Sequence, residues 1–207
     1  AASALLGAPE RMEVDSIALG CAPRLDSSIE TAFLLAALAD RAGDKVHVLA
    51  ADSHVRARVS GVRGPKIIET LARTFTDISA RLDVTDWSQV VAAVEQTVHH
   101  SAFVVIATKI PPAGMETEFT DALSRLTERH TVLVASATDP DELRARRGRA
   151  DAEEVFLAAS AALSQRADEA GAADVRLAGA LTLQASADLL PARTADRYIE
   201  LKKSGRL

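Results

Sequence analysis

The sequence predicts an α/β fold, a doubly wound three-layer domain with a mostly parallel sheet covered by helices on both faces. Short apolar runs with little alternation are typical of strands that are buried on both faces. Segments with helical periodicity separate these runs, which is the order of βαβ units with right-handed crossovers. Alanine is abundant, and small side chains let helices lie close to a sheet. The 207 residues, 48% of them hydrophobic, suffice for one such domain over residues 1–207.

Five continuous apolar runs are the predicted strands of the sheet. They span residues 3–7, 46–51, 103–107, 132–137 and 175–180. The segment 54–59 differs from them, because its valines alternate with arginines at period two. This pattern predicts a half-exposed edge strand, antiparallel to its neighbour and reached through a turn at Asp52 and Ser53.

Six helices are predicted between and after the strands. The run Ser27-Ser28-Ile29-Glu30 is a capping box that predicts the start of the first helix, and Gly43 predicts its end. Pro65 is expected at the first position of the second helix, and Asp86 is expected to cap the third. The last three helices are predicted at 119–126, about 151–169 and about 189–203. Residues 139–150, with a basic run at 144–149, are predicted to form an exposed, solvated loop.

Composition excludes several classes of protein. The net charge of −5 gives no electrostatic reason to expect binding to nucleic acid or to an anionic membrane. The single cysteine, Cys21, cannot form an internal disulfide or a cysteine-based zinc site. No apolar run reaches eighteen residues, so no direct membrane insertion by this chain is expected. The first residues contain neither an initiator methionine nor a basic leader, which suggests that the chain was cut from a longer protein or had its start removed.

Motif searches find no catalytic or cofactor-binding pattern. No phosphate-binding loop follows a strand, and the segment Gly61-Val-Arg-Gly64 lacks the third glycine of a dinucleotide fingerprint. No Gly-x-Ser-x-Gly nucleophile elbow occurs. None of the five histidines has metal-ligand spacing, and His99 and His100 fall at a predicted helix end, where a basic group suits the helix dipole. The motif search therefore identifies no catalytic residue and no cofactor.

The one remaining candidate is a cation site at the carboxyl ends of the strands, where ligands of open parallel sheets collect. The first loop offers Asp15 and Ser16, the third helix begins with Thr85 and Asp86, and Thr108 follows a strand. Carboxylates and hydroxyls are the ligands of a hard cation such as magnesium. The next residue, Lys109, places an ammonium group where a carboxylate would help.

Several segments together resemble the bacterial proteins called domain of unknown function 58. They are residues 23–26 (Pro-Arg-Leu-Asp), 41–46 (Arg-Ala-Gly-Asp-Lys-Val), 55–59 (Val-Arg-Ala-Arg-Val), 86–87 (Asp-Trp) and the ending 196–207. The resemblance implies a von Willebrand factor A-like, Rossmann-like fold and an association with MoxR-type AAA+ ATPases. It further implies that the full-length protein is membrane-anchored, with this part soluble on the cytoplasmic face of the membrane.

The resemblance also identifies the candidate site as a degenerate metal-ion-dependent adhesion site. The superfamily motif Asp-x-Ser-x-Ser has no match at residues 7–11, and at 15–19 only Asp15 is kept. Thr85 fills the threonine position, and Lys109 stands where the final aspartate is expected. An ammonium in place of a carboxylate opposes cation binding, so we expect no metal. The expected partner surface consists of Asp15, Ser16, Thr85, Asp86, Thr108 and Lys109.

The resulting hypothesis is a non-catalytic protein-interaction module that acts as adaptor for a MoxR-type AAA+ ATPase. One alternative is a divalent-cation-dependent ligand-binding A-domain, in which Asp15, Ser16, Thr85 or Asp86 rebuild a shifted site. Another alternative is an unrecognised hydrolase or Rossmann-type enzyme. Binding of magnesium or manganese distinguishes the second class, because a ligand selective for the native state raises the melting temperature.

Overall fold

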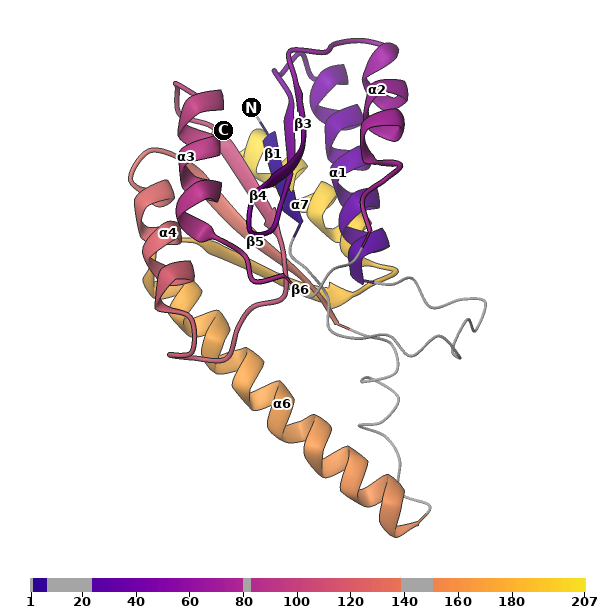
Figure 1. Ribbon diagram of the computed structural model, residues 1–207, viewed down its shortest axis with the longest axis vertical. Coiled ribbons are helices and arrows are strands. Elements are labelled where there is room, and N and C mark those ends of the chain that lie inside the picture. Colours follow the sequence, from indigo (N-terminus) through magenta and orange to yellow (C-terminus); the bar gives the residue numbers. More distant parts are fainter. Residues whose placement is uncertain (1, 7–23, 80–82, 139–150) are drawn as a thin grey trace.

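The protein has a mixed α/β fold, as predicted, with a parallel sheet and a small antiparallel pair (Figure 1). The computed structural model describes residues 2–6, 24–79, 83–138 and 151–207. The parallel sheet has the strand order β1-β4-β5-β6, and β2 pairs with β3 in the antiparallel pair and lies beside β1. The strands are β1 (Ala2–Leu6), β2 (His47–Ala51), β3 (Val55–Ser60), β4 (Phe103–Ala107), β5 (Thr131–Thr138) and β6 (Leu181–Ser186).

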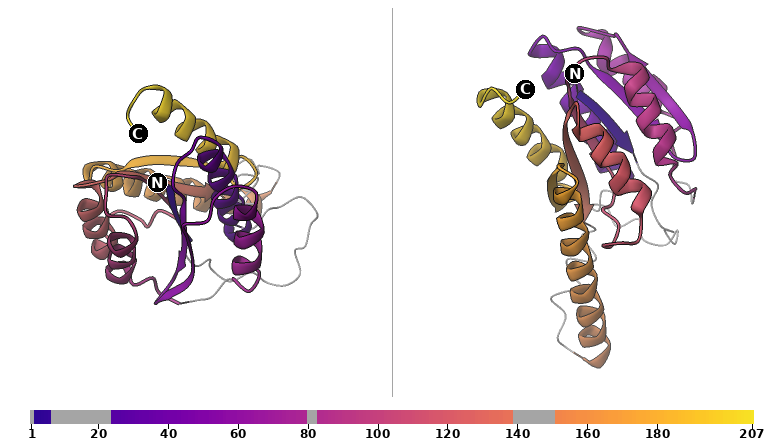
Figure 2. Two further views of the ribbon diagram at one scale, coloured as in Figure 1. Left: turned by 90° about the horizontal axis from the view of Figure 1, so that it is seen from above. Right: turned by 90° about the vertical axis from the view of Figure 1, so that its left-hand side faces the viewer.

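Alternate side chains of the central strands pack into two hydrophobic clusters on opposite sides of the sheet. Phe103 and Val105 of β4 point into one cluster, and Val104 and Ile106 point into the other. This two-sided burial explains the continuous apolar runs in the sequence. The first cluster contains α1 (Arg24–Arg41), α2 (Lys66–Phe75) and α7 (Leu190–Lys203); the second contains α3 (Trp87–Thr97), α4 (Thr117–Thr127) and the end of α6 (Ala152–Leu177) (Figure 2, left).

The long helix α6 corrects the prediction of a strand at 175–180. The helix continues to Leu177, well past the predicted end at 169, and the strand in this region is β6 at Leu181–Ser186. Val175 is buried because the last turns of α6 pack against α4. Its apolar side chain therefore indicates contact between helices and not a strand. Gly179 then takes a φ of 86°, which ends the helix. The first half of α6 extends beyond the body as an arm (Figure 2, right).

The predicted capping box is also wrong. Helix α1 already includes Arg24, so Ser27 and Ser28 lie inside it. The Ser27 hydroxyl donates to the carbonyl oxygen of Ala187 at 2.6 Å, and the Ser28 hydroxyl donates to that of Arg24 at 2.9 Å. Buried hydroxyls that bond to carbonyl oxygens are compatible with a helix interior, and one of them joins α1 to the segment between β6 and α7.

Other local predictions are confirmed. Residues 55–60 form the antiparallel edge strand β3, with Val59 opposite Val48 of β2. Asp86 caps α3 by accepting a hydrogen bond from the Gln89 amide at 3.1 Å, and Pro65 directly precedes α2. The predictions for Cys21 and for the loop 139–150 fall outside the described residues. Within the described chain, no helix combines the length and hydropathy needed to cross a bilayer.

Candidate functional site

A cleft of about 410 Å³ lies at the carboxyl ends of β4 and β5. Four segments contribute to its lining: the start of α1, the residues before α3, the loop from β4 to α4, and the end of β5. This is the position at which open α/β sheets bind ligands. The residues on which the argument depends are Thr85, Trp87, Thr108 and Lys109, with Asp83, Val84, Met115 and Glu116 at the surface.

The segment before α3 is held in place from two sides. The Asp86 amide donates to the carbonyl oxygen of Asp52 at 3.0 Å, which joins this segment to the turn between β2 and β3. Trp87 is buried against Phe119 of α4, with ring centroids 4.6 Å apart. An anchored backbone and a packed indole therefore position Thr85 at the cleft.

The β4 to α4 loop brings Thr108 and Lys109 to the same cleft. The Thr108 amide donates to the Ala135 carbonyl oxygen at 3.1 Å, so the loop starts as a continuation of the parallel pairing with β5. The Ile110 amide then points to the Ser136 hydroxyl at 3.4 Å, and Ile110 is buried. Lys109 between these two anchors is exposed, and in the described chain its ammonium group makes no hydrogen bond or ion pair.

The structure places only part of the predicted partner surface in one cleft. Thr85, Thr108 and Lys109 line one cleft, whereas Asp86 is not among the lining residues. The Asp86 carboxylate instead accepts hydrogen bonds from the Ser88 hydroxyl at 2.6 Å and from Gln89, and these bonds lower its pKa. Asp86 is therefore committed to capping α3. Asp15 and Ser16, the other two predicted residues, lie outside the described residues.

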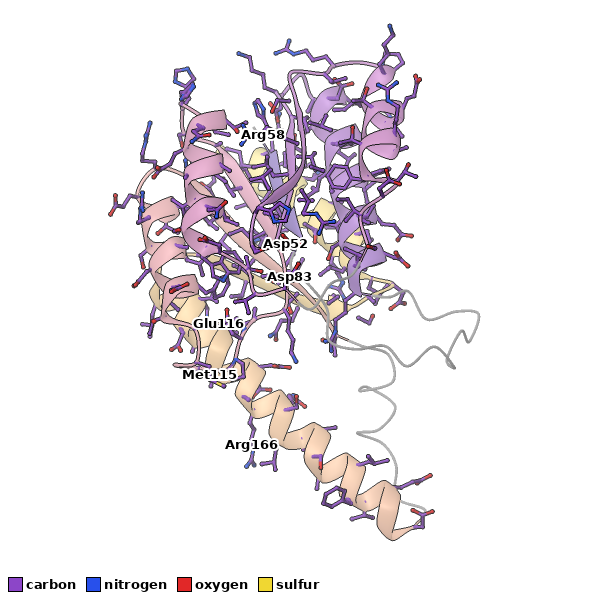
Figure 3. All side chains as sticks on the ribbon, in the orientation of Figure 1. Asp52, Arg58, Asp83, Met115, Glu116 and Arg166 are labelled. Carbon is purple, nitrogen blue, oxygen red and sulfur yellow. The ribbon has the colours of Figure 1, made fainter. Side chains whose placement is uncertain are left out.

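Two carboxylates of the cleft, Asp83 and Glu116, were not predicted from the sequence (Figure 3). Asp83 lies four residues before the start of α3, Glu116 directly precedes α4, and both are exposed. The starts of α3 and α4 could have located them, because the chain is at the carboxyl end of the sheet where each of these helices begins. Asp83 and Glu116 could then have been placed beside the residues that directly follow β4.

Exposed apolar side chains accompany these charges. Val84 is 85% exposed and Met115 is 74% exposed, although both residues line the cleft. Pro111 and Pro112 add further apolar surface, and Trp87 forms a buried part of the lining. A cleft that combines hydroxyls and charges with large exposed hydrophobic groups has the composition of a protein contact site.

The side chains of the cleft do not fit a divalent cation. Among the described residues, no group of three or more histidine, cysteine, aspartate or glutamate side chains could hold a metal ion. The Asp86 oxygens are already used by α3, and Lys109 lines the cleft in which the cation would lie. A positive charge at this position repels a divalent cation.

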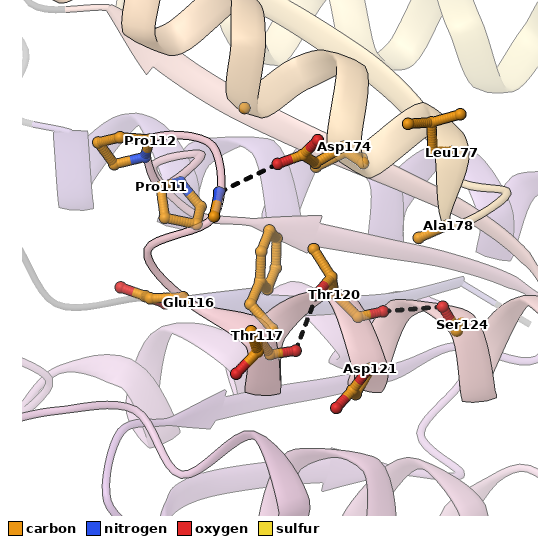
Figure 4. A pocket seen from close by; sticks show the side chains of 14 residues that line it. Pro111, Pro112, Glu116, Thr117, Thr120, Asp121, Ser124, Asp174, Leu177 and Ala178 are labelled. Atoms are coloured by element: carbon orange, nitrogen blue, oxygen red, sulfur yellow. Dashed lines mark hydrogen bonds between the residues drawn. The ribbon is translucent and has the colours of Figure 1, made fainter.

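A second pocket, of about 320 Å³, lies beside the cleft between the β4 to α4 loop and α6 (Figure 4). Asp174 of α6 accepts a hydrogen bond from the Gly114 amide at 3.2 Å across this pocket. Gly171 is buried against the loop, and a Cβ atom on it would overlap the carbonyl oxygen of Pro111. The end of α6 therefore supports the loop that carries Lys109 and Met115.

Comparisons with known proteins place the chain in a family without naming an activity. No curated protein matches it. The family model described as "Protein of unknown function DUF58" matches residues 14–184. That match covers most of the chain, including all the cleft residues described above. This chain therefore belongs to the DUF58 family.

Proposed function

We propose that the protein is a non-catalytic protein-interaction module whose cleft at the carboxyl end of the sheet binds a partner protein. The observation that carries this proposal is the setting of Lys109. Lys109 is exposed, its ammonium group has no bonding partner in the described chain, and it lines the same cleft as Thr85, Thr108 and the exposed apolar side chains of Val84 and Met115. Uncommitted groups of this kind are available to a partner.

The chemistry of the cleft favours a partner segment with a carboxylate beside an apolar residue. The Lys109 ammonium binds a carboxylate directly, and the hydroxyls of Thr85 and Thr108 are suitable additional donors. Burying Val84 and Met115 would contribute about 1.5–3 kcal/mol for each side chain that becomes fully covered. In this proposal the Lys109 ammonium binds the partner carboxylate that a metal ion would bind in an intact adhesion site. The site is called degenerate for this reason.

The finer assignments of fold and partner are part of the same proposal. We infer a von Willebrand factor A-like, three-layer doubly wound domain, which the helices on both sides of the sheet support. The position of β2 between β3 and β1 agrees with the strand order 3-2-1-4-5-6. The proposed partner is a MoxR-type AAA+ ATPase, to which the protein acts as adaptor at the cytoplasmic face of the membrane. The resemblance of the sequence motivates this choice.

The test measures binding of the cognate ATPase to the full chain and to matched variants. Trp87 is the only tryptophan and lines the cleft, so its fluorescence reports occupancy directly. Lys109→Asp is expected to weaken binding by at least about tenfold, because the ammonium becomes a like charge for the partner carboxylate. Lys66→Asp makes the same change in net charge at the other end of the molecule and should leave binding unchanged.

Two results would contradict the proposal. The first is an ATPase that fails to bind the unmodified chain, or that binds the Lys109→Asp and Lys66→Asp variants equally. The second is a rise in melting temperature with millimolar magnesium or manganese that is lost in Asp83→Asn. That rise would favour the divalent-cation-dependent A-domain, since a ligand selective for the native state stabilises it.

A further inference from the structure

The amino end of the parallel sheet, opposite the cleft, carries a concentrated set of exposed cations. We call this set the cationic face. Its residues come from the end of α1, the start of β2, the turn before α2, and the ends of α4 and α7 (Figure 1). They are Arg41, Lys45, Arg63, Lys66, Arg129, Lys203 and Arg206.

Hydrogen bonds between the elements hold these segments together at one end. Lys202 of α7 donates to Asp44, just before β2, at 2.6 Å, and the Gly64 amide donates to Asp40 of α1 at 2.8 Å. Arg129 donates to the carbonyl oxygen of His99, which follows α3, at 3.0 Å. The cationic face is therefore a fixed feature of the fold, assembled from segments far apart in the sequence.

Nearby carboxylates do not neutralise the cationic face. Asp44 is paired with Lys202, Glu95 with Arg125, and Glu200 with Arg197. In the described part of this end, Asp40, which accepts only from a neutral backbone amide, Glu69 and Glu128 are the carboxylates left to oppose seven cations. The molecule as a whole has a net charge of −5, so its acidic excess lies elsewhere.

Helix dipoles alone do not account for this arrangement. Basic residues at the ends of α1, α4 and α7 are stabilised by the partial negative charge of these helix C-termini. Lys66, however, is the first residue of α2, and Arg63 lies just before it, where the dipole disfavours a positive charge. Lys45 and Arg206 lie outside the helices. The positive charge therefore exceeds what helix stability requires.

We propose that the cationic face binds the surface of an anionic phospholipid bilayer. The cations lie on one end of the molecule, at the ends of separate elements, so a planar surface can meet several of them at once. The phenylalanine and tyrosine at this end, Phe103 and Tyr198, are buried and unavailable for base stacking, whereas the His99 and His100 rings are exposed. Charges at the far end of the sheet are screened beyond about 8 Å at physiological ionic strength. The overall net charge therefore does not prevent this contact.

Sedimentation with lipid vesicles tests the proposal on the full chain. We expect binding to mixed phosphatidylglycerol and phosphatidylcholine vesicles at about 0.05 M NaCl, weakening strongly at about 0.5 M. Vesicles of phosphatidylcholine alone should not bind. Each lysine or arginine near an anionic membrane changes the partition coefficient about fivefold, so the double substitution Arg63→Gln with Lys66→Gln should lower it by about 25-fold.

The matched control is Arg166→Gln with Arg193→Gln, which removes the same charge from α6 and from the first turn of α7. This control should bind vesicles like the unmodified chain. Equal loss in the two double variants would overturn the proposal, as would equal binding to the two kinds of vesicle. Tighter binding to poly-glutamate than to the anionic vesicles, lost in the Arg63 and Lys66 double variant, would instead assign an acidic polypeptide to the cationic face.

Discussion

The two ends of the parallel sheet are built differently, although the same helices and strands supply both. At the amino end, polar side chains join the elements: Asp44 accepts hydrogen bonds from Tyr198 and Lys202, both at 2.6 Å. At the carboxyl end, aromatic packing supports the cleft, and Lys109 at its surface is left without a bonding partner in the described chain. The comparison shows that the Asp44 carboxylate joins elements at the amino end, whereas the Lys109 ammonium at the carboxyl end is left available.

The largest effect is expected from a substitution that removes the aromatic support of the cleft. Phe119→Ala should lower the free energy of unfolding by about 3–5 kcal/mol, because Phe119 is fully buried against Trp87. Urea unfolding measures the loss, and Trp87 fluorescence should shift to longer wavelength as water reaches the indole. The control is Phe156→Ala, since Phe156 is 71% exposed on α6 and should change stability little. Similar losses in the two variants would contradict the packing assigned to the carboxyl end.

A second substitution tests the contact between α6 and the loop of the cleft. Gly171→Ala should cost about 1–3 kcal/mol, because its Cβ atom would meet the Pro111 backbone and lie 3.1 Å from the Ile110 Cγ2 atom. A gain in stability would instead show that the helix propensity of alanine outweighs the overlap. Ala170→Gly, at an exposed neighbouring position, is the control and should cost about 1 kcal/mol through helix propensity alone.

A third substitution removes the polar network of the amino end. Asp44→Asn should cost about 1–2 kcal/mol at neutral pH, a modest value because Asp44 and Lys202 are each about one-third exposed. Added salt should reduce this cost but leave that of Phe119→Ala unchanged. Asp188→Asn, at an exposed position near the carboxyl end, is the control. A cost that is independent of salt would contradict the ionic character of the network.

The same network has a predictable dependence on pH. Burial by itself would raise the pKa of Asp44, but hydrogen bonds from Lys202 and Tyr198 outweigh it and lower the pKa below its ordinary value of 3.8. The carboxylate therefore contributes stability above pH 3.8, and this contribution is lost as the pH falls through the lowered pKa. Asp44→Asn should lack that part of the acid destabilisation in unfolding experiments.

The smallest expected effect concerns His130, at the start of β5. Burial, and then the nearby charge of Arg129, lower its pKa below the ordinary 6.5, and its Nδ1 atom has no hydrogen-bond partner in the described chain. The unfolded state then binds more protons between the lowered pKa and 6.5, so the protein loses stability as the pH falls through this range. His130→Leu should lose less stability than the unmodified chain between pH values of about 7.5 and 5.5. Equal losses on urea unfolding would contradict this assignment.

The predictions that succeeded depend on local physical rules. Asp86 caps α3 and the alternating segment forms β3 because caps and period-two patterns depend on neighbouring residues. The errors arose where distant contacts decided the outcome. Val175 was assigned to a strand, but packing against α4 keeps it helical, and Ser27 is satisfied by Ala187, 160 residues away in sequence.

The candidate site shows the same division between what local rules predict and what distant contacts decide. Thr85, Thr108 and Lys109 could be proposed as neighbours because loops after parallel strands and before helices meet at one end of a sheet. Asp86 was predicted both to cap α3 and to belong to the site, and the structure shows that the cap commits its carboxylate to Ser88 and Gln89. Asp83 and Glu116 needed the path of both loops before they could be placed in the cleft.

Composition and periodicity alone predict an acidic α/β chain with buried strands. Only the folded structure separates the charges, because parallel strands with helical crossovers bring distant segment ends to two opposite ends of the sheet. The net charge of −5 is a sum over the whole chain and does not show where on the molecule the charges lie. The cationic face exists because the fold places Arg41, Arg63, Arg129 and Lys203 at one end, and screening in water lets that end act independently of the total.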